Sequence, residues 1–285
     1  MPESFSSKLE KAFSTKGQLC VGIDPHSELI IEAGLDDTVA GLETFSLRLL
    51  DEVSEVAGII KPQVSFFERF GSRGFQVLEN LLIEANRRGL LVIADAKRGD
   101  IGSTMQAYTD AWLSKDAPFI CDALTLSPYL GFGTLNSAIA SAAERGKGVF
   151  ILCATSNPEG VQVQQASVGE GTVALEVATQ AAKYNSVTAT SKTRFGNVGL
   201  VIGATVDLSS FGLTLNNGVS DHRAPILAPG FGTQGASLSD VRKLFGDNAR
   251  DVICNVSRSA LRNGLVNARA AVIEDQQILA RALAG

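Results

Sequence analysis

The chain has 285 residues, 45% of them hydrophobic, which is enough apolar material for one large core or two smaller ones and excludes an intrinsically disordered protein. Its 25 Lys and Arg residues stand against 30 Asp and Glu residues, and the net charge of -5 argues against nucleic acid as a partner, because binding to phosphate backbones needs an excess of basic residues. No apolar run of about 20 residues and no signal-peptide pattern is found, so we expect a cytoplasmic protein that does not enter a membrane.

Short apolar runs rich in Val, Ile and Leu alternate along the chain with longer stretches of helical period. The runs predict eight strands, near residues 19–24, 57–62, 90–95, 118–124, 148–153, 197–203, 224–229 and 251–256. Helices are predicted near residues 41–56, 72–88, 103–115, 133–145, 170–185, 237–246 and 258–284. The strands are apolar on both alternating faces, which is typical of parallel strands that are covered on both sides.

Eight β units with helical crossovers in a chain of this length predict an α/β fold, a (β/α)8 TIM barrel, rather than an open doubly wound sheet. Residues 205–222 are rich in Gly, Asn and Ser and have no helical period, so we expect an insertion or a short helix with a loop there. No repeat, linker or charge block divides the chain. We therefore expect one barrel domain over residues 1–285, with two α/β lobes as the alternative.

The cysteines and histidines offer little material for a metal site. Each cysteine stands inside a short apolar run, which predicts a buried thiol; the four are Cys20, Cys121, Cys153 and Cys254. No CxxC motif occurs, and with only His26 and His222 as further ligands a zinc site of His and Cys is close to excluded. A metal ion held by carboxylates alone stays open.

Charged residues stand at the carboxyl ends of the first three predicted strands, where a TIM barrel carries its active site. They are Asp24 on strand one, Lys61 on strand two, and Asp95, Lys97 and Asp100 at the end of strand three. Because side chains alternate along a strand, Asp95 and Lys97 are expected to point together into the barrel mouth. We expect the five groups to titrate as one interacting set.

A lysine flanked by carboxylates keeps its proton, so Lys97 is suited to be an acid rather than a Schiff-base nucleophile, which needs a lowered pKa. Ion pairs that only fix a loop are the alternative interpretation of the same charges.

A second candidate site follows the last two strands. In the sequence APGFGTQGAS, the glycines Gly230, Gly232 and Gly235 precede a helix start at Ser237, which predicts a cradle of backbone N–H groups for an anion. Arg258, after the last strand, could meet a phosphate dianion with charge-assisted hydrogen bonds. The loops after strands seven and eight are the usual phosphate site of barrel enzymes. Tight turns alone would also explain the glycines.

Several other residues carry weaker signals. Ser127 and Pro128 after strand four, and Ser156 after strand five, could bind a ligand ring, but turns rich in Pro and Ser explain them equally well. His26 is expected to be a surface loop residue. Tyr108 and Trp112 are expected to pack the helix after strand three.

These motifs resemble those of the orotidine 5′-phosphate decarboxylase family in its longer bacterial form. DAKRGDIGST (95–104) resembles the D-x-K-x-x-D signature of the family, and PGFGTQGA (229–236) and SRSA (257–260) resemble its phosphate-binding loops. Ala236 and Ser257 stand where many members have a glycine, and neither departure removes a functional group. The resemblance extends from the first strand to the last helix, outside residues 162–170 and 205–222.

The resemblance implies a role for each site residue. Asp24 and Lys61 would hold ribose hydroxyls, Asp95 would face the substrate carboxylate, and Lys97 would protonate C6 of the pyrimidine as carbon dioxide leaves. The residues implied to bind the pyrimidine or the 5′-phosphate are Ser156, Pro229, Gly230, Gln234, Gly235 and Arg258. Asp100, Ile101 and Thr104 would contribute to the substrate site, Asp100 and Thr104 by reaching across a homodimer interface into the site of the partner.

The implied reaction converts orotidine 5′-phosphate to uridine 5′-phosphate without cofactor or metal. A ring carbanion without an electron sink must be stabilised electrostatically, which fits the fixed ammonium groups. The nearest rival is a magnesium-dependent sugar-phosphate enzyme of the same suprafamily, which needs a metal-binding acid on strand two, where this chain has Lys61. A second rival is a barrel that binds a nucleotide without catalysis.

Overall fold

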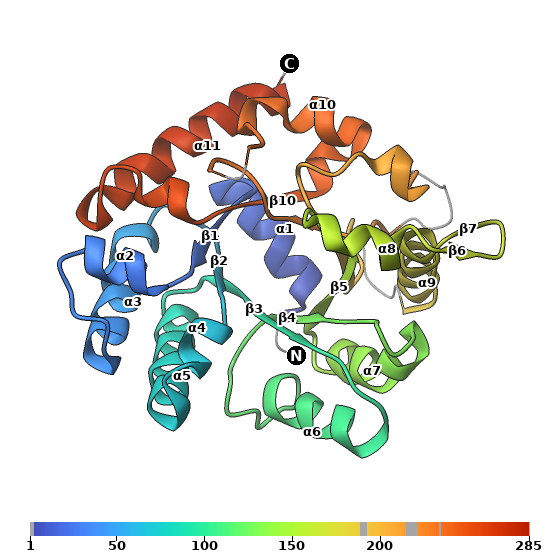
Figure 1. Cartoon of the computed structure of the whole chain (residues 1–285), viewed down its shortest axis with the longest axis horizontal. Helices are drawn as coiled ribbons and strands as arrows, with labels where there is room; N and C mark the ends of the chain where they lie inside the picture. Colours follow the sequence, from blue (N-terminus) through green and yellow to red (C-terminus); the bar gives the residue numbers. More distant parts are fainter. Residues whose placement is uncertain (1–2, 189–192, 215–221, 234, 285) are drawn as a thin grey trace.

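The computed structural model of the protein describes residues 3–188, 193–214, 222–233 and 235–284. Its centre is a closed barrel of eight parallel strands, in the order β1-β10-β9-β8-β5-β4-β3-β2 (Figure 1). The barrel strands are β1 (Leu19–Ile23), β2 (Ile59–Pro62), β3 (Leu91–Arg98), β4 (Ala123–Leu126), β5 (Gly148–Ala154), β8 (Val198–Ile202), β9 (Ile226–Ala228) and β10 (Val252–Val256). The predicted (β/α)8 TIM barrel is confirmed.

The helices after α1 (Phe5–Lys16) surround the barrel in chain order, and α1 lies across one end of it (Figure 1). The surrounding helices are α2 (Ser27–Glu32), α3 (Val39–Val53), α4 (Ser65–Glu68), α5 (Gly71–Arg87), α6 (Gly102–Trp112), α7 (Asn136–Glu144), α8 (Val161–Gln164), α9 (Val173–Thr188), α10 (Val241–Phe245) and α11 (Ala268–Ala284). A small antiparallel hairpin of β6 (Ser167–Val168) and β7 (Gly171–Thr172) follows α8. No helix in the described ranges combines the length and the apolar character that a membrane crossing requires.

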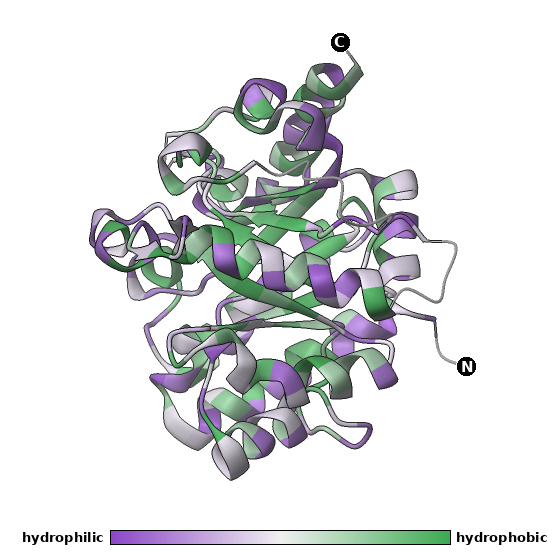
Figure 2. Ribbon diagram, turned by 90° about the vertical axis from the view of Figure 1, so that its right-hand side faces the viewer, coloured by the Kyte–Doolittle hydropathy of each residue, from purple (hydrophilic) through white to green (hydrophobic). Residues whose placement is uncertain are grey.

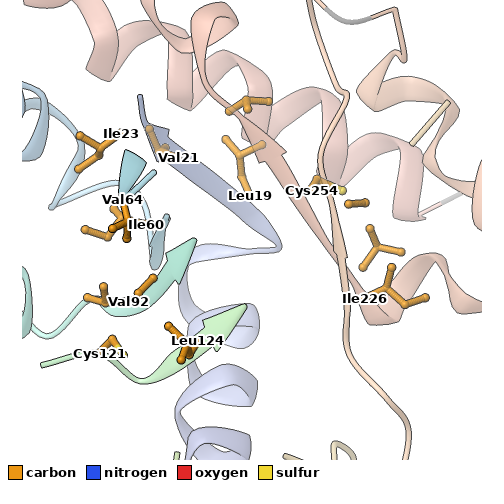
Figure 3. Packing of buried hydrophobic residues seen from close by; sticks show 14 of the residues in the cluster. Leu19, Val21, Ile23, Ile60, Val64, Val92, Cys121, Leu124, Ile226 and Cys254 are labelled. Atoms are coloured by element: carbon orange, nitrogen blue, oxygen red, sulfur yellow. The ribbon is translucent and has the colours of Figure 1, made fainter. Parts of the chain in front are cut away.

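Residues alternate between the two faces of each barrel strand, and both faces are buried. Ile60 and Val92 belong to the layer between the strands and the helices, whereas Ile59, Leu91 and Ile93 belong to the cluster inside the barrel. Figure 3 shows part of the outer layer, and Figure 2 shows the central strands as largely hydrophobic. The four cysteines are buried free thiols, as predicted.

Helix α1 closes the amino-terminal end of the barrel. Ser4 caps this helix by accepting a backbone N–H bond, and one apolar face, formed by Phe5, Leu9 and Ala12, enters the cluster inside the barrel. The ring of Phe5 packs edge-on against Phe150 of β5 with 5.8 Å between ring centroids. Apolar side chains therefore fill the barrel interior at its amino-terminal end.

Two predicted elements differ from those in the structure. The fourth strand was expected at 118–124 but begins at Ala123, because Phe119 packs instead on Trp112 of α6, with 4.5 Å between the ring centroids. The last helix was expected at 258–284 but begins at Ala268. Short 3-10 turns precede it, and Gly264 between them has a φ of 84°, which interrupts helical geometry.

The segment 205–222 has little regular structure in its described part. It contains a 3-10 turn at Leu208–Phe211, which Asp207 caps with its carboxylate. Residues 215–221 lie outside the described residues. Helices α1 and α2 were not predicted, because both lie outside the alternation of strands and crossover helices that guided the assignment.

We expect Leu9→Ala to lower the free energy of unfolding by about 2 to 5 kcal/mol, the usual cost of a cavity at a fully buried leucine. Urea unfolding followed by circular dichroism measures this change. Ile31→Ala is the control, because this side chain on α2 is 60% exposed and its loss should cost at most about 0.5 kcal/mol. Equal costs for the two variants would show that α1 is not part of the core.

Candidate active site

A cavity of about 600 Å³ lies at the carboxyl-terminal end of the barrel, and this size suits a small-molecule ligand. Its lining comes from both sides of the barrel, from β1 and β2 round to β9 and β10. The predicted site residues that line it are Asp24, Lys61, Asp95, Lys97, Ser156, Pro229, Gly230 and Arg258. A larger hollow of about 860 Å³ lies between α1 and α11 at the other end, and none of the predicted site residues lines it.

The polar residues of the cavity continue the inward-facing positions of the strands. On β3, Leu91 and Ile93 face the barrel interior, and Asp95 is the next residue of the same face. On β2, Ile59 occupies the interior cluster and Lys61 follows two residues later. The barrel interior is therefore apolar at its base and charged at its mouth.

An array of alternating charges forms the floor of the cavity. The Nζ atom of Lys61 lies 2.9 Å from Oδ2 of Asp95 and 4.0 Å from Oδ1 of Asp24. The Nζ atom of Lys97 lies 2.6 Å from Oδ1 of Asp95. Asp95 therefore binds one ammonium group with each carboxylate oxygen, and Asp95 and Lys97 are neighbours as expected.

The neighbouring charges determine the protonation states of Asp95 and Lys61. Burial by itself would raise the pKa of Asp95, but the charges and hydrogen bonds of Lys61 and Lys97 outweigh burial and hold the pKa well below its usual range. Burial by itself would lower the pKa of Lys61, but Asp95 and then Asp24 raise it above its ordinary value. Asp95 is thus a carboxylate and Lys61 an ammonium at neutral pH.

The backbone of Lys97 departs from a regular strand. Its φ is 50°, the only positive φ at a non-glycine residue in the described ranges, and such a conformation costs about 1 to 2 kcal/mol. The register between β3 and β4 shifts between Ala94 and Arg98, which marks a β-bulge. Lys97 therefore reaches Asp95 through a bulge, and the simple alternation assumed from the sequence is wrong here.

Asp100 does not join the array within one chain. Its Oδ1 accepts a hydrogen bond of 2.8 Å from the backbone N–H of Ile101, and Asp100 does not line the cavity. Ion pairs therefore join four of the five charges in this chain, namely Asp24, Lys61, Asp95 and Lys97. Ile101 and Thr104 are exposed at the start of α6, and Ile101 is 60% exposed.

The glycine-rich turn after β9 forms the other side of the cavity. Its backbone closes on itself, because the N–H of Gly232 donates to the carbonyl of Ala236 at 2.8 Å and the N–H of Gly235 donates to the carbonyl of Gly232 at 3.0 Å. The predicted free N–H groups are therefore used inside the turn at these two glycines. Ser237 caps the next 3-10 turn, as expected, and Gln234 lies outside the described residues.

Arg258 is exposed at the start of a 3-10 turn after β10 and lines the cavity near Gly230. Within the described part of the chain no carboxylate forms an ion pair with it. A guanidinium of this kind can bind an anionic ligand group.

The residues with weaker signals divide into two groups. His26 lines the cavity and so is more than a surface loop residue, whereas Ser127 and Pro128 do not line it. Trp112 is buried in the core as expected, and the Arg98 guanidinium lies over the ring of Tyr108, 5.4 Å from its centroid.

The sequence analysis missed several residues that line the cavity, among them Thr125, Asn255 and Gln63. Thr125 on β4 and Asn255 on β10 are buried inward-facing residues, and Gln63 follows β2 and accepts a hydrogen bond of 3.3 Å from Nζ of Lys97. Ala123 on β4 and Ile253 on β10 face the barrel interior. Because side chains alternate along a strand, the residues two positions later, Thr125 and Asn255, were predictable as inward-facing. Gln63 has no such signal.

Some buried polar atoms around the cavity have no hydrogen-bond partner within the described structure. They are Oδ1 of Asp24 and Oδ1 of Asn255. Such atoms are costly to bury unless a ligand or solvent binds them. No three His, Cys, Asp or Glu side chains of the described residues are grouped as a metal site.

Comparison with known proteins identifies relatives of this chain. The family model described as orotidine 5′-phosphate decarboxylase / HUMPS family matches residues 17–272. An orotidine 5′-phosphate decarboxylase of Streptomyces coelicolor is 48% identical over 264 residues, which cover 92% of this chain and 91% of the relative. One from Nocardioides sp. is 45% identical over 262 residues, which cover 90% of this chain and 92% of the relative.

Solved structures share the same barrel. A crystal structure of a Streptomyces avermitilis protein superposes with a TM-score of 0.91 and 44% identity, covering 99% of this chain and 97% of the other. The OMP decarboxylase of Leishmania donovani gives a TM-score of 0.74 and 31% identity, covering 99% of this chain and all 100% of the other. With a family model that matches most of its length and relatives that are nearly half identical, the chain belongs to the orotidine 5′-phosphate decarboxylase / HUMPS family.

Proposed function

We propose that the protein decarboxylates orotidine 5′-phosphate to uridine 5′-phosphate, the last step of pyrimidine nucleotide (UMP) biosynthesis. The observation that carries this proposal is the buried carboxylate of Asp95 between the ammonium groups of Lys61 and Lys97 on the cavity floor. The curated relatives that cover most of the chain and share nearly half of its residues bear the name of this decarboxylase.

Lys97 is the proposed proton donor. When the bond between C6 and the substrate carboxylate breaks, carbon dioxide leaves and the electron pair stays on C6, where the Lys97 ammonium delivers a proton. The fixed positive charges of Lys97 and Lys61 lower the energy of the developing carbanion, because they need no reorganisation as the charge forms. The proposed reaction thus uses neither a cofactor nor a metal ion, and Asp95 faces the departing carboxylate.

The substrate is proposed to lie across the cavity. Asp24, whose Oδ1 accepts no hydrogen bond in the described structure, and Lys61 bind the ribose hydroxyls, and Ser156 binds the amide edge of the pyrimidine. The residues proposed for the phosphate side are Pro229, Gly230, Gln234, Gly235 and Arg258. Binding energy from this remote phosphate can orient the ring over Lys97.

A homodimer is proposed to complete the site, with Asp100 and Thr104 entering the cavity of the partner and Ile101 beside them as a further substrate-binding residue. None of these residues lines the cavity of its own chain. An apolar surface lies beside them, because Ile101 after β3 is 60% exposed, and Tyr129 and Leu130 after the adjacent β4 are 77% and 51% exposed. Exposed apolar patches of this kind mark protein interfaces.

The cytoplasm is the proposed location. All four cysteines are free thiols, and burial raises the pKa of Cys121 and of Cys153 to about 12, which keeps both thiols protonated. Buried unpaired thiols suit a reducing compartment.

The direct test is turnover of orotidine 5′-phosphate in excess EDTA, which ultraviolet absorbance follows. Lys97→Ala should lower kcat by about 10³-fold or more, while the affinity for UMP changes little. Lys11→Ala removes an exposed ammonium on α1, at the opposite end of the barrel, and should leave kcat unchanged. Retained turnover in Lys97→Ala would refute the acid role. Activity on sugar phosphates that needs magnesium would favour the metal-dependent rival, and nucleotide binding without turnover in either assay would favour the non-catalytic one.

Arg258→Ala should weaken binding of UMP by about 10- to 100-fold, the usual worth of a hydrogen bond to a charged group, and leave binding of uridine unchanged. Isothermal titration calorimetry with the two ligands measures the difference. Arg242→Ala, an exposed arginine on α10 outside the cavity, is the control. If UMP and uridine lost the same affinity, Arg258 would not bind the phosphate.

Mixing two inactive variants tests the shared site. Lys97→Ala and Asp100→Ala chains, unfolded and refolded together, should regain about a quarter of the activity, because half of the dimers are mixed and each has one intact site. A mixture of Lys97→Ala with Asp95→Asn should regain none, since both residues line the cavity of the same chain. No regain in the first mixture would contradict the proposed dimer site.

A further inference from the structure

The hydroxyl of Thr125 connects the two residues at the centre of the charge array. Thr125 lies on β4 and is 1% exposed. Its Oγ1 donates a hydrogen bond of 3.0 Å to Oδ1 of Asp95 and accepts one of 2.9 Å from the backbone N–H of Lys97. The same carboxylate oxygen accepts the 2.6 Å hydrogen bond from the Lys97 ammonium. Thr125 thus binds the backbone of Lys97, and Asp95, to which Thr125 is itself hydrogen-bonded, binds its side chain.

The bulge explains why the backbone of Lys97 needs this partner. In β3 five residues, from Ala94 to Arg98, span the stretch that three residues span in β4, from Leu124 to Leu126. The bulged residues lose their place in the ladder between the strands. The Thr125 side chain supplies the acceptor that the ladder no longer offers to the Lys97 N–H.

A single hydroxyl proton makes the two hydrogen bonds interdependent. With its proton directed at Asp95, Oγ1 turns its lone pairs toward the Lys97 amide. Gln63 supports the other end of the lysine, because its Oε1 accepts from Nζ at 3.3 Å and its Nε2 donates to the Asp95 carbonyl at 3.1 Å. Gln63 thus fixes the side chain of Lys97 at its exposed end, and Thr125 fixes the backbone at its buried end.

We propose that Thr125 is a positioning residue, whose hydroxyl holds Lys97 in its left-handed backbone conformation so that the ammonium stays beside Asp95. The proposal rests on the proposed function for its kinetic consequence. It acts through Lys97 and Asp95 and requires no contact between Thr125 and the reacting atoms. A displacement of a reacting group by about 1 Å can cost about 10²-fold in rate.

The test compares Thr125→Val, which keeps the shape and removes the hydroxyl, with Thr125→Ser, which keeps the hydroxyl. Thr125→Val should lower kcat for orotidine 5′-phosphate by about 10- to 100-fold with little change in KM, and Thr125→Ser should restore most of the rate. Thr179→Val is the control, because its hydroxyl bonds the Leu175 carbonyl on α9, away from the cavity. If Thr125→Val does not fold, Thr125→Ala takes its place.

Amide hydrogen exchange at Lys97, measured by NMR without substrate, gives a readout that does not depend on turnover. Exchange should accelerate in Thr125→Val and stay slow in Thr125→Ser. An unchanged exchange rate or an unchanged kcat in Thr125→Val, or a loss of kcat that serine does not restore, would overturn the proposal. If the unaltered protein failed to decarboxylate the substrate, the proposed function would fall, and the exchange rates would still decide whether Thr125 holds Lys97.

Discussion

The candidate site depends on the two hydrogen-bonded ion pairs of the Asp95 carboxylate, at 2.9 Å to Lys61 and 2.6 Å to Lys97. Burying these charges costs free energy, which their mutual attraction offsets only when the geometry is close and the remaining lone pairs are bonded. Thr125 supplies one of those bonds. Removal of Asp95 would leave the buried ammonium of Lys61 without its closest partner, whereas removal of the more exposed Lys97 leaves the pair of Asp95 and Lys61 in place.

The barrel supplies both the stability and the rigidity that such a set requires. Below the array the interior is apolar, and α1 seals it with Phe5 and Leu9, so hydrophobic burial at the base can offset the cost of charges at the mouth. Lys61 and Asp95 lie on strands that are paired on both sides rather than on loops. A site on such strands keeps its charges in place before any ligand arrives, which electrostatic catalysis requires.

The sequence predicted the barrel because every strand is a short apolar run, and it predicted Asp24, Lys61, Asp95 and Lys97 because they interrupt those runs at the carboxyl ends. It placed the fourth strand too early, since an apolar run does not reveal whether Phe119 packs in a sheet or on a helix. Asp100 looked like part of the array because sequence spacing does not show which way a loop turns. Thr125 was missed because threonine is common in strands that have no function.

The bulge at Lys97 limits how the motif can be transferred to another protein. On a regular strand, residues two apart are separated by about 6.6 Å along the strand, and the backbone of the lysine would be extended. Here Lys97 has a left-handed backbone with a φ of 50°, and its N–H donates to a hydroxyl from the neighbouring strand. A designer who grafts Asp-x-Lys onto a different barrel must therefore also copy the two extra residues of β3 and a threonine on the adjacent strand, because the three-letter motif alone does not encode the position of its ammonium.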